Sequence, residues 1–274
     1  MTGTVRLLVS DVDGTLVTTA KDLTPASVEA AALLREAGVM LALVSSRPPR
    51  GMAALAAKLG IDTPLAGFNG GTILDAAGRV VSERLVPEAA GRTTLAAFAR
   101  AGIDAWVFAD GEWLLRDPDG EYVPLERRTI GFDPRVVDDL AAAAARAGKL
   151  VGASSDAAKL AGCEAALQRE LGTTATAHRS QTYYLDVTNP EADKGHALLS
   201  LAGLLDVGTA EVACIGDMGN DLPMFAVAGM AIAMGNAPPA VQARAAAVTR
   251  SNDEDGFAAA VRDFVLPRAP GRSA

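Results

Sequence analysis

The chain opens with a short apolar run, Val5–Ser10, that is followed at once by two carboxylates, Asp11 and Asp13. Such a run, rich in branched residues and ended by Gly14, is typical of a buried strand. Residues two apart in an extended chain point to the same side, so we expect both carboxylates to lie in one small volume at the carboxyl end of this strand. Because two close negative charges repel each other, a bound cation or a shared proton is needed there.

A second acidic cluster follows another apolar run. We predict a strand over Val212–Ile215, and the segment Gly216–Asp221 after it contributes Asp217. Mg²⁺ prefers carboxylate and carbonyl oxygens, which Asp11, the backbone carbonyl of Asp13 and Asp217 would supply if the two strands lie in one parallel sheet. Each aspartate taken alone could instead form a turn or cap a helix.

Strand and helix signals alternate along the first and last parts of the chain. This alternation predicts an α/β fold with a doubly wound, Rossmann-like parallel sheet. The middle of the chain instead combines helices with pairs of strands, including a hairpin over residues 105–115 and a helix over residues 134–147. We therefore expect one core domain, formed by residues 1–86 and 188–274, that is split by an inserted α+β domain over residues 87–187.

The composition excludes several classes of function. Aromatic residues make up only 4% of the chain, which argues against platforms that stack nucleic-acid bases. A net charge of −8 over 274 residues argues against a nucleic-acid-binding or anionic-membrane surface. Cys163 and Cys214 show no metal-ligand spacing and imply no disulfide framework. With no recognisable signal peptide or membrane span, we expect a cytoplasmic monomer or homodimer.

Polar side chains at the ends of other predicted elements are candidates for binding phosphate or substrate. Ser45 ends a predicted strand and precedes a helix start, where a hydroxyl and backbone N–H groups suit a phosphate oxygen. It could equally be a simple helix cap, Arg47 could be a surface residue, and Asn69 could serve only a turn. The full set of candidates is Ser45, Ser46, Arg47, Asn69, Gly70, Asn189 and Asn220.

Lys194 begins a helix predicted over residues 194–204. A lysine in the first turn opposes the helix dipole, which suggests a task such as neutralising a phosphate and a nucleophilic carboxylate. An exposed surface lysine is the alternative. We expect Asp221 to anchor the metal site and Lys194 without coordinating the metal itself, although it could merely cap its own helix. His178 and His196 show no triad or metal spacing, and we interpret both as ordinary.

Together these residues predict phosphoryl transfer. Asp11 would attack phosphorus and form an aspartyl-phosphate. Asp13 would protonate the leaving group and then take a proton from the attacking water. Mg²⁺ would hold the nucleophile and the phosphoryl group, while Lys194 and Ser45 would stabilise the charge on the phosphoryl oxygens.

Four segments resemble, in order, the motifs of the haloacid dehalogenase-like superfamily. They are Asp11–Thr15, Val44–Arg47 with Ser45, Asp193–Gly195 with Lys194, and Gly216–Asp221. Ser45 and Ser46 stand where relatives often have Thr-Gly. The insertion and the segment Asn69–Gly71 resemble the Cof-type branch, subfamily IIB, with a C2-type cap.

The resemblance implies a Mg²⁺-dependent phosphatase of sugar phosphates and other small phosphate esters, in which the cap closes over the core and shapes substrate choice. Three alternatives remain. A phosphomutase related to phosphomannomutases would share the first motif and a similar cap. A non-catalytic phosphosugar-binding protein is disfavoured by the retained Asp11, Asp13, Lys194 and Asp217. A dehalogenase would not need Asp13 or the metal cluster.

Overall fold

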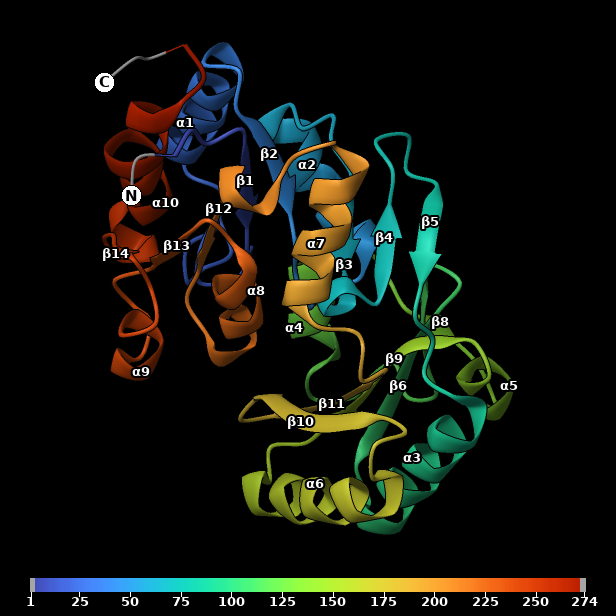
Figure 1. Cartoon of the computed structure of the whole chain (residues 1–274). Coiled ribbons are helices and arrows are strands. Elements are labelled where there is room, and N and C mark those ends of the chain that lie inside the picture. Colours follow the sequence, from blue (N-terminus) through green and yellow to red (C-terminus); the bar gives the residue numbers. More distant parts are fainter. Residues whose placement is uncertain (1–2, 272–274) are drawn as a thin grey trace. The chain divides into compact units, whose positions relative to one another are not determined.

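A five-stranded parallel sheet organises the first of two units in the computed structural model, which describes residues 3–271 (Figure 1). Its strands run in the order β14-β13-β12-β1-β2. Their bounds are β1 Leu7–Ser10, β2 Met40–Leu43, β12 Val212–Gly216, β13 Met230–Ala233 and β14 Ala247–Val248. Leu7 pairs with Val212 on one side and with Met40 on the other, so segments from opposite ends of the chain lie side by side.

Helices cover both faces of this sheet, and successive residues of β1 point to opposite faces. Leu8 enters one apolar cluster with Leu34 of α1, whereas Leu7 enters another with Leu198 of α7. The helices of this unit are α1 Pro25–Glu36, α2 Ala53–Leu59, α7 Lys194–Leu204, α8 Leu222–Val227, α9 Pro239–Gln242 and α10 Gly256–Ala260. The predicted doubly wound α/β fold is confirmed.

A smaller three-stranded sheet lies beyond the end of β2 in the chain. It consists of β3 Leu65–Gly67, β4 Thr72–Leu74 and β5 Val80–Glu83, in that order. An isolated parallel bridge between Val44 and Ala66 brings the residue after β2 beside β3. The carboxyl ends of β2 and β3 therefore lie at the same edge of the unit.

The second unit comprises residues 47–51 and 82–192 and has its own six-stranded sheet. The order is β10-β11-β9-β6-β7-β8, with antiparallel pairs except for β7 with β8. The strands are β6 Asp104–Ala109, β7 Glu112–Leu115, β8 Arg135–Val136, β9 Ala147–Ala153, β10 Thr176–Gln181 and β11 Tyr184–Thr188. The helices are α3 Glu88–Ala101, α4 Val123–Ile130, α5 Ala141–Ala144 and α6 Ala157–Leu171. A separate apolar core, which includes Phe98, Leu150 and Leu167, lies between this sheet and its helices.

One prediction about the second unit was wrong, and one helix of that unit was missed. The helix expected over residues 134–147 is instead the two-residue strand β8 and the single turn α5, and residue 147 already belongs to β9. Helix α4 was not predicted. The hairpin around residues 105–115 is confirmed as β6 and β7.

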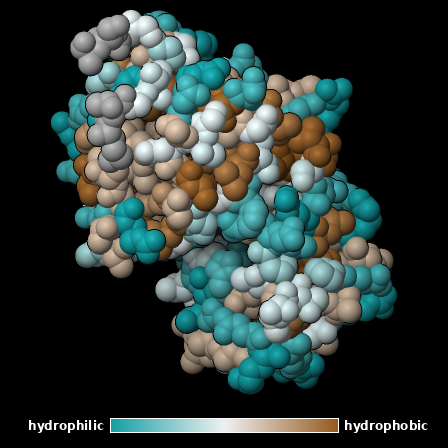
Figure 2. Space-filling view, viewed as in Figure 1, coloured by the Kyte–Doolittle hydropathy of each residue, from teal (hydrophilic) through white to brown (hydrophobic). Residues whose placement is uncertain are grey.

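The surface carries scattered apolar residues among hydrophilic ones (Figure 2). The large exposed apolar side chains include Val80 and Val81 of β5 and Leu204 of α7. Within residues 3–271, no helix is both long enough and apolar enough to cross a membrane.

Candidate active site

Asp11 stands directly after β1, which has a paired strand on each side in the first unit's sheet. Its backbone N–H donates a hydrogen bond of 3.0 Å to the carbonyl of Ile215 in β12, which extends the ladder by one residue. The Asp11 side chain is only 6% exposed. A carboxylate is thus held rigidly at the carboxyl end of the sheet, where it has little access to water.

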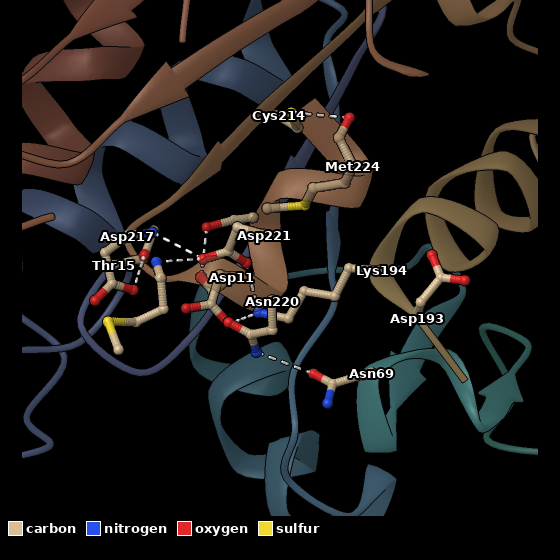
Figure 3. Close-up of polar contacts among 12 residues, drawn as sticks. Asp11, Thr15, Asn69, Asp193, Lys194, Cys214, Asp217, Asn220, Asp221 and Met224 are labelled. Atoms are coloured by element: carbon tan, nitrogen blue, oxygen red, sulfur yellow. Dashed lines mark hydrogen bonds and ion pairs between the residues drawn. The ribbon is translucent and has the colours of Figure 1, made fainter. Parts of the chain in front are cut away.

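Lys194 is the first residue of α7, and Asp193 caps the same helix. The Asp193 carboxylate accepts hydrogen bonds from the backbone N–H groups of Gly195 (2.8 Å) and His196 (3.1 Å). This cap fixes the first turn, from which the Lys194 ammonium group reaches the carboxylates of Asp11 and Asp221, each at 2.6 Å (Figure 3). The lysine predicted to act beside the nucleophile is therefore buried between two carboxylates.

Asp221 also shapes the loop after β12. Its second carboxylate oxygen accepts hydrogen bonds of 2.8 Å from the backbone N–H groups of Asp217 and Met218. Asp217 in turn accepts a hydrogen bond of 3.1 Å from the hydroxyl of Thr15. These bonds join the loops after β1 and β12, so that the two predicted acidic clusters meet (Figure 3).

The three buried carboxylates of Asp11, Asp217 and Asp221 offer oxygen atoms that all lie within 4.8 Å of one another. Burial, with the charges of Asp221 and Asp217, raises the pKa of Asp11 well above its usual value. Burial and the charge of Asp221 likewise raise the pKa of Asp217 to about 6. Burial alone would lower the pKa of Lys194, but the charges of Asp11 and Asp221 prevail and raise it.

This charge balance tests whether the residues fit a metal ion. The ammonium group of Lys194 balances one of the three negative charges. Burial first, and then the charges of the neighbouring carboxylates, raise the pKa values of Asp11 and Asp217. A set of carboxylate oxygens with excess negative charge is the donor set that hard divalent cations prefer. The cluster therefore fits a divalent metal ion.

Asp13 is not one of these three carboxylates. Its carboxylate forms an ion pair of 2.8 Å with Lys21, and its side chain is 23% exposed. The predicted metal contact of Asp13 uses its backbone carbonyl and stays a prediction. Its more accessible side chain is compatible with the predicted acid–base role, which also stays a prediction.

The loops after β2 and β3 are joined to the same region. The backbone N–H of Asn69 donates a hydrogen bond to the backbone carbonyl of Ser45 (2.8 Å). The side-chain N–H of Asn220 donates one to the side-chain oxygen of Asn69 (3.2 Å). Phe68 and Asn69 both have left-handed backbones, with φ of 51° and 57°, and Gly70 follows with φ of 101°. This unusual turn directs the Asn69 side chain toward Asn220, as Figure 3 shows.

The remaining residues predicted to contact phosphate or substrate are Ser46, Arg47 and Asn189. Ser46 is half-buried, and Arg47 and Asn189 belong to the second unit. The Asn189 amide donates to the carbonyl of Leu85 (2.9 Å) and its side-chain oxygen accepts from the N–H of Glu191 (2.9 Å). These bonds are those of a turn residue, and a substrate contact for Asn189 and Arg47 stays a prediction.

Sequence reasoning missed Thr15 and Asn236 as partners of Asp217. The amide of Asn236 donates to the carbonyl of Gly14 (2.9 Å) and to the Asp217 carboxylate (3.4 Å). Asn236 follows β13, the strand next to β12, so the rule that identified the other candidates would also have found it. Thr15 was visible in the first acidic segment but had no assigned partner.

Comparison with known proteins identifies the family of the chain. A family model described as haloacid dehalogenase-like hydrolase matches residues 8–261. A stretch of 90 residues is 47% identical to the Bacillus subtilis protein YxeH, and it spans 33% of each chain. The chain is 28% identical to the 5-amino-6-(5-phospho-D-ribitylamino)uracil phosphatase YwtE of B. subtilis, covering 93% of this chain and 96% of the relative.

Among solved structures, a haloacid dehalogenase-like hydrolase from Bacteroides thetaiotaomicron superposes with a TM-score of 0.88 at 29% identity. The match covers 94% of this chain and 98% of the other. The chain therefore belongs to the haloacid dehalogenase-like hydrolases, and it is an enzyme of the phosphoric monoester hydrolase class.

Proposed function

We propose that this enzyme is a Mg²⁺-dependent phosphatase that hydrolyses small phosphate monoesters, sugar phosphates among them, through an aspartyl-phosphate on Asp11. The observation that carries this proposal is the buried ammonium group of Lys194, held 2.6 Å from both Asp11 and Asp221. It fixes one oxygen of the nucleophile and supplies positive charge where an anionic phosphoryl group must approach.

The residues divide the chemistry between them. The Asp11 carboxylate attacks phosphorus, and Asp13 donates a proton to the departing alkoxide. Asp13 then accepts a proton from the water that hydrolyses the acyl phosphate, while Lys194 stabilises negative charge on the phosphoryl oxygens. A Mg²⁺ ion held by Asp11, Asp217 and the backbone carbonyl of Asp13 would screen the repulsion between carboxylate and phosphate. Ser45 and Asn220 are proposed to bind the phosphate or the substrate.

The second unit is proposed to act as a cap domain, predicted over residues 87–187, that selects the substrate. The family provides the chemistry at the acidic cluster, whereas the residues that distinguish one phosphate ester from another must lie elsewhere. The name of the B. subtilis relative describes a phosphorylated ribityl compound, which supports a small sugar-derived ester as the substrate class. A cytoplasmic location and a monomeric or homodimeric state remain predictions.

Release of phosphate from a panel of phosphorylated metabolites, with Mg²⁺ and with chelator, tests the proposal. Asp11→Asn should abolish turnover while the circular dichroism spectrum stays unchanged, and wild-type enzyme quenched during turnover should carry a phosphate adduct on the peptide that contains Asp11. Asp62→Asn, at an exposed loop position, is the matched control and should retain full activity. Hydrolysis that survives in Asp11→Asn, or that is unaffected by chelator, would contradict the proposal.

A further inference from the structure

Lys21 contacts the carboxylate of Asp13 from outside the buried cluster. Its ammonium group lies 2.8 Å from Asp13, and the two side chains are 31% and 23% exposed. An ion pair this accessible to water contributes little to the free energy of unfolding. Stability alone therefore does not account for the geometry of this contact.

The backbone at Lys21 is held in a conformation that non-glycine residues rarely adopt. Its φ is 71°, in the left-handed region. The Lys21 N–H donates to the carbonyl of Thr18 (2.9 Å), and the Thr18 N–H donates to the carbonyl of Asp22 (2.9 Å), which closes a tight loop. Strained residues of this kind persist where the surrounding structure fixes them, and they are concentrated at functional sites.

Residues from the far end of the chain hold this loop in place. The N–H and hydroxyl groups of Thr19 both donate to the carboxylate of Asp253, each at 2.8 Å. These hydrogen bonds lower the pKa of Asp253, because they favour its charged form. The side-chain amide of Asn252 donates to the carbonyl of Val17 (3.1 Å). The loop is thus fastened on both sides, with Lys21 directed at Asp13.

We propose that Lys21 is a positioning residue that orients the Asp13 carboxylate for proton transfer to and from the substrate. The inference rests on the acid–base role proposed for Asp13. Lys21 acts through Asp13, so its contribution depends on how much the reaction needs a well-placed proton donor. An alkyl phosphate has a poor leaving group and needs that donor, whereas 4-nitrophenyl phosphate has a good leaving group and needs it little.

The test compares these two substrates at saturating Mg²⁺ by kcat/KM, which reports the steps up to departure of the leaving group. Lys21→Asn removes the ammonium group while asparagine tolerates the left-handed backbone. We expect it to lower kcat/KM about tenfold for glycerol phosphate, and less than about twofold for 4-nitrophenyl phosphate. Lys21→Arg should restore most of the loss, and Lys58→Gln, at an exposed position of α2, should show none.

Asp13→Asn is measured beside these variants to separate the two hypotheses. In one outcome, Asp13→Asn loses more kcat/KM on the alkyl ester than on 4-nitrophenyl phosphate, while Lys21→Asn loses the same on both esters or nothing on either. That result would overturn the role of Lys21 and leave the role of Asp13 intact. If Asp13→Asn itself shows no dependence on the leaving group, the acid–base role fails, and the role of Lys21 fails with it. A selective loss in both variants, rescued by arginine, supports the inference.

Discussion

Lys194 determines the charge balance of the buried cluster, because its ammonium group contacts two carboxylates at once. Lys194→Met keeps the apolar stem but leaves Asp11 and Asp221 facing each other. We expect the free energy of unfolding to fall by about 3–5 kcal/mol, as when one partner of a buried ion pair is removed. Urea denaturation at neutral pH measures this loss, and a phosphate-release assay should show no turnover.

Lys58→Met is the control for that substitution, since Lys58 is exposed on α2. It should change the free energy of unfolding by less than about 0.5 kcal/mol. A Lys194→Met variant as stable as this control would show that the buried cluster does not depend on the ammonium group.

Asp217 makes the free energy of unfolding of the metal-free protein depend on pH. Its pKa in the folded state is about 6, above the usual value of 3.8, so folding favours the protonated form. Stability from this group is fully present below pH 3.8 and is lost as the pH rises through 6, by up to about 3 kcal/mol. With chelator present, Asp217→Asn should therefore become more stable relative to wild type as the pH rises from 4 to 7.

Urea denaturation of both proteins at several pH values measures this difference. The charge of Asp217 also helps to raise the pKa of Asp11, so the difference between the two proteins reports the loss of the Asp217 charge together with its effect on Asp11. Added Mg²⁺ should stabilise wild type at pH 7 and have little effect on Asp217→Asn. A difference between the two proteins that does not change with pH would contradict the assignment.

At the scale of elements, Gly70 sets the distance between the turn after β3 and the first turn of α7. A Cβ added there would lie 2.8 Å from the Cβ of Ala197 and 3.0 Å from the carbonyl of Asp193, at a φ of 101°. Gly70→Ala should lower the free energy of unfolding by about 2–4 kcal/mol and reduce kcat, because the start of α7 that carries Lys194 must move.

Gly78→Ala is the matched control for this substitution. Gly78 also has a positive φ, 77°, but a Cβ there would meet no atom within 4 Å. It should cost about 1 kcal/mol through backbone strain alone and leave kcat unchanged. Thermal unfolding and steady-state kinetics on both variants separate strain from displacement of α7; equal kinetics in the two variants would rule out displacement.

The elements that sequence reasoning identified correctly are those with a clear local signal. The apolar runs before Asp11 and Asp217 are strands, and α7 has the predicted bounds of Lys194–Leu204. The predicted helix over residues 134–147 was wrong, because alanine favours a helix only when packing allows one. Ala147 pairs with Ala109 as the start of β9, and the turn at Ala144 packs against α3.

The same contrast applies to the site. Asp11, Asp217, Asp221 and Lys194 could be identified because each stands beside a strand or helix boundary with a chemical reason to be there. Thr15 and Lys21 could not be assigned a partner, since their contacts depend on how loops fold against one another. A left-handed backbone at a lysine, in particular, has no sequence signature.

At the scale of the whole molecule, the two units contain separate reporters of unfolding. Cys214 is buried in the core of the first unit, and both tryptophans, Trp106 and Trp113, are buried in the second. The proposed metal ligands belong to the first unit alone. At a Mg²⁺ concentration of a hundred times its Kd, that unit should gain about 2.7 kcal/mol.

We therefore expect Mg²⁺ to raise the urea midpoint for labelling of Cys214 more than the midpoint for tryptophan fluorescence. A Cys163→Ala background leaves one thiol to follow, since the second free cysteine lies in the other unit. Midpoints that shift together would show that the units unfold as one, and Asp217→Asn should remove the shift in either case.

The strands of the first unit's sheet are synthesised at widely separated times. The strand that carries Asp11 pairs with Met40–Leu43, which follows early, and with Val212–Gly216, which is synthesised only after all of residues 82–192. On the ribosome, the nascent chain can finish the inserted unit while the nucleophile's strand still has one unpaired edge. Any fragment that stops short of residue 212 exposes that edge, and we expect such fragments to aggregate or to require a chaperone.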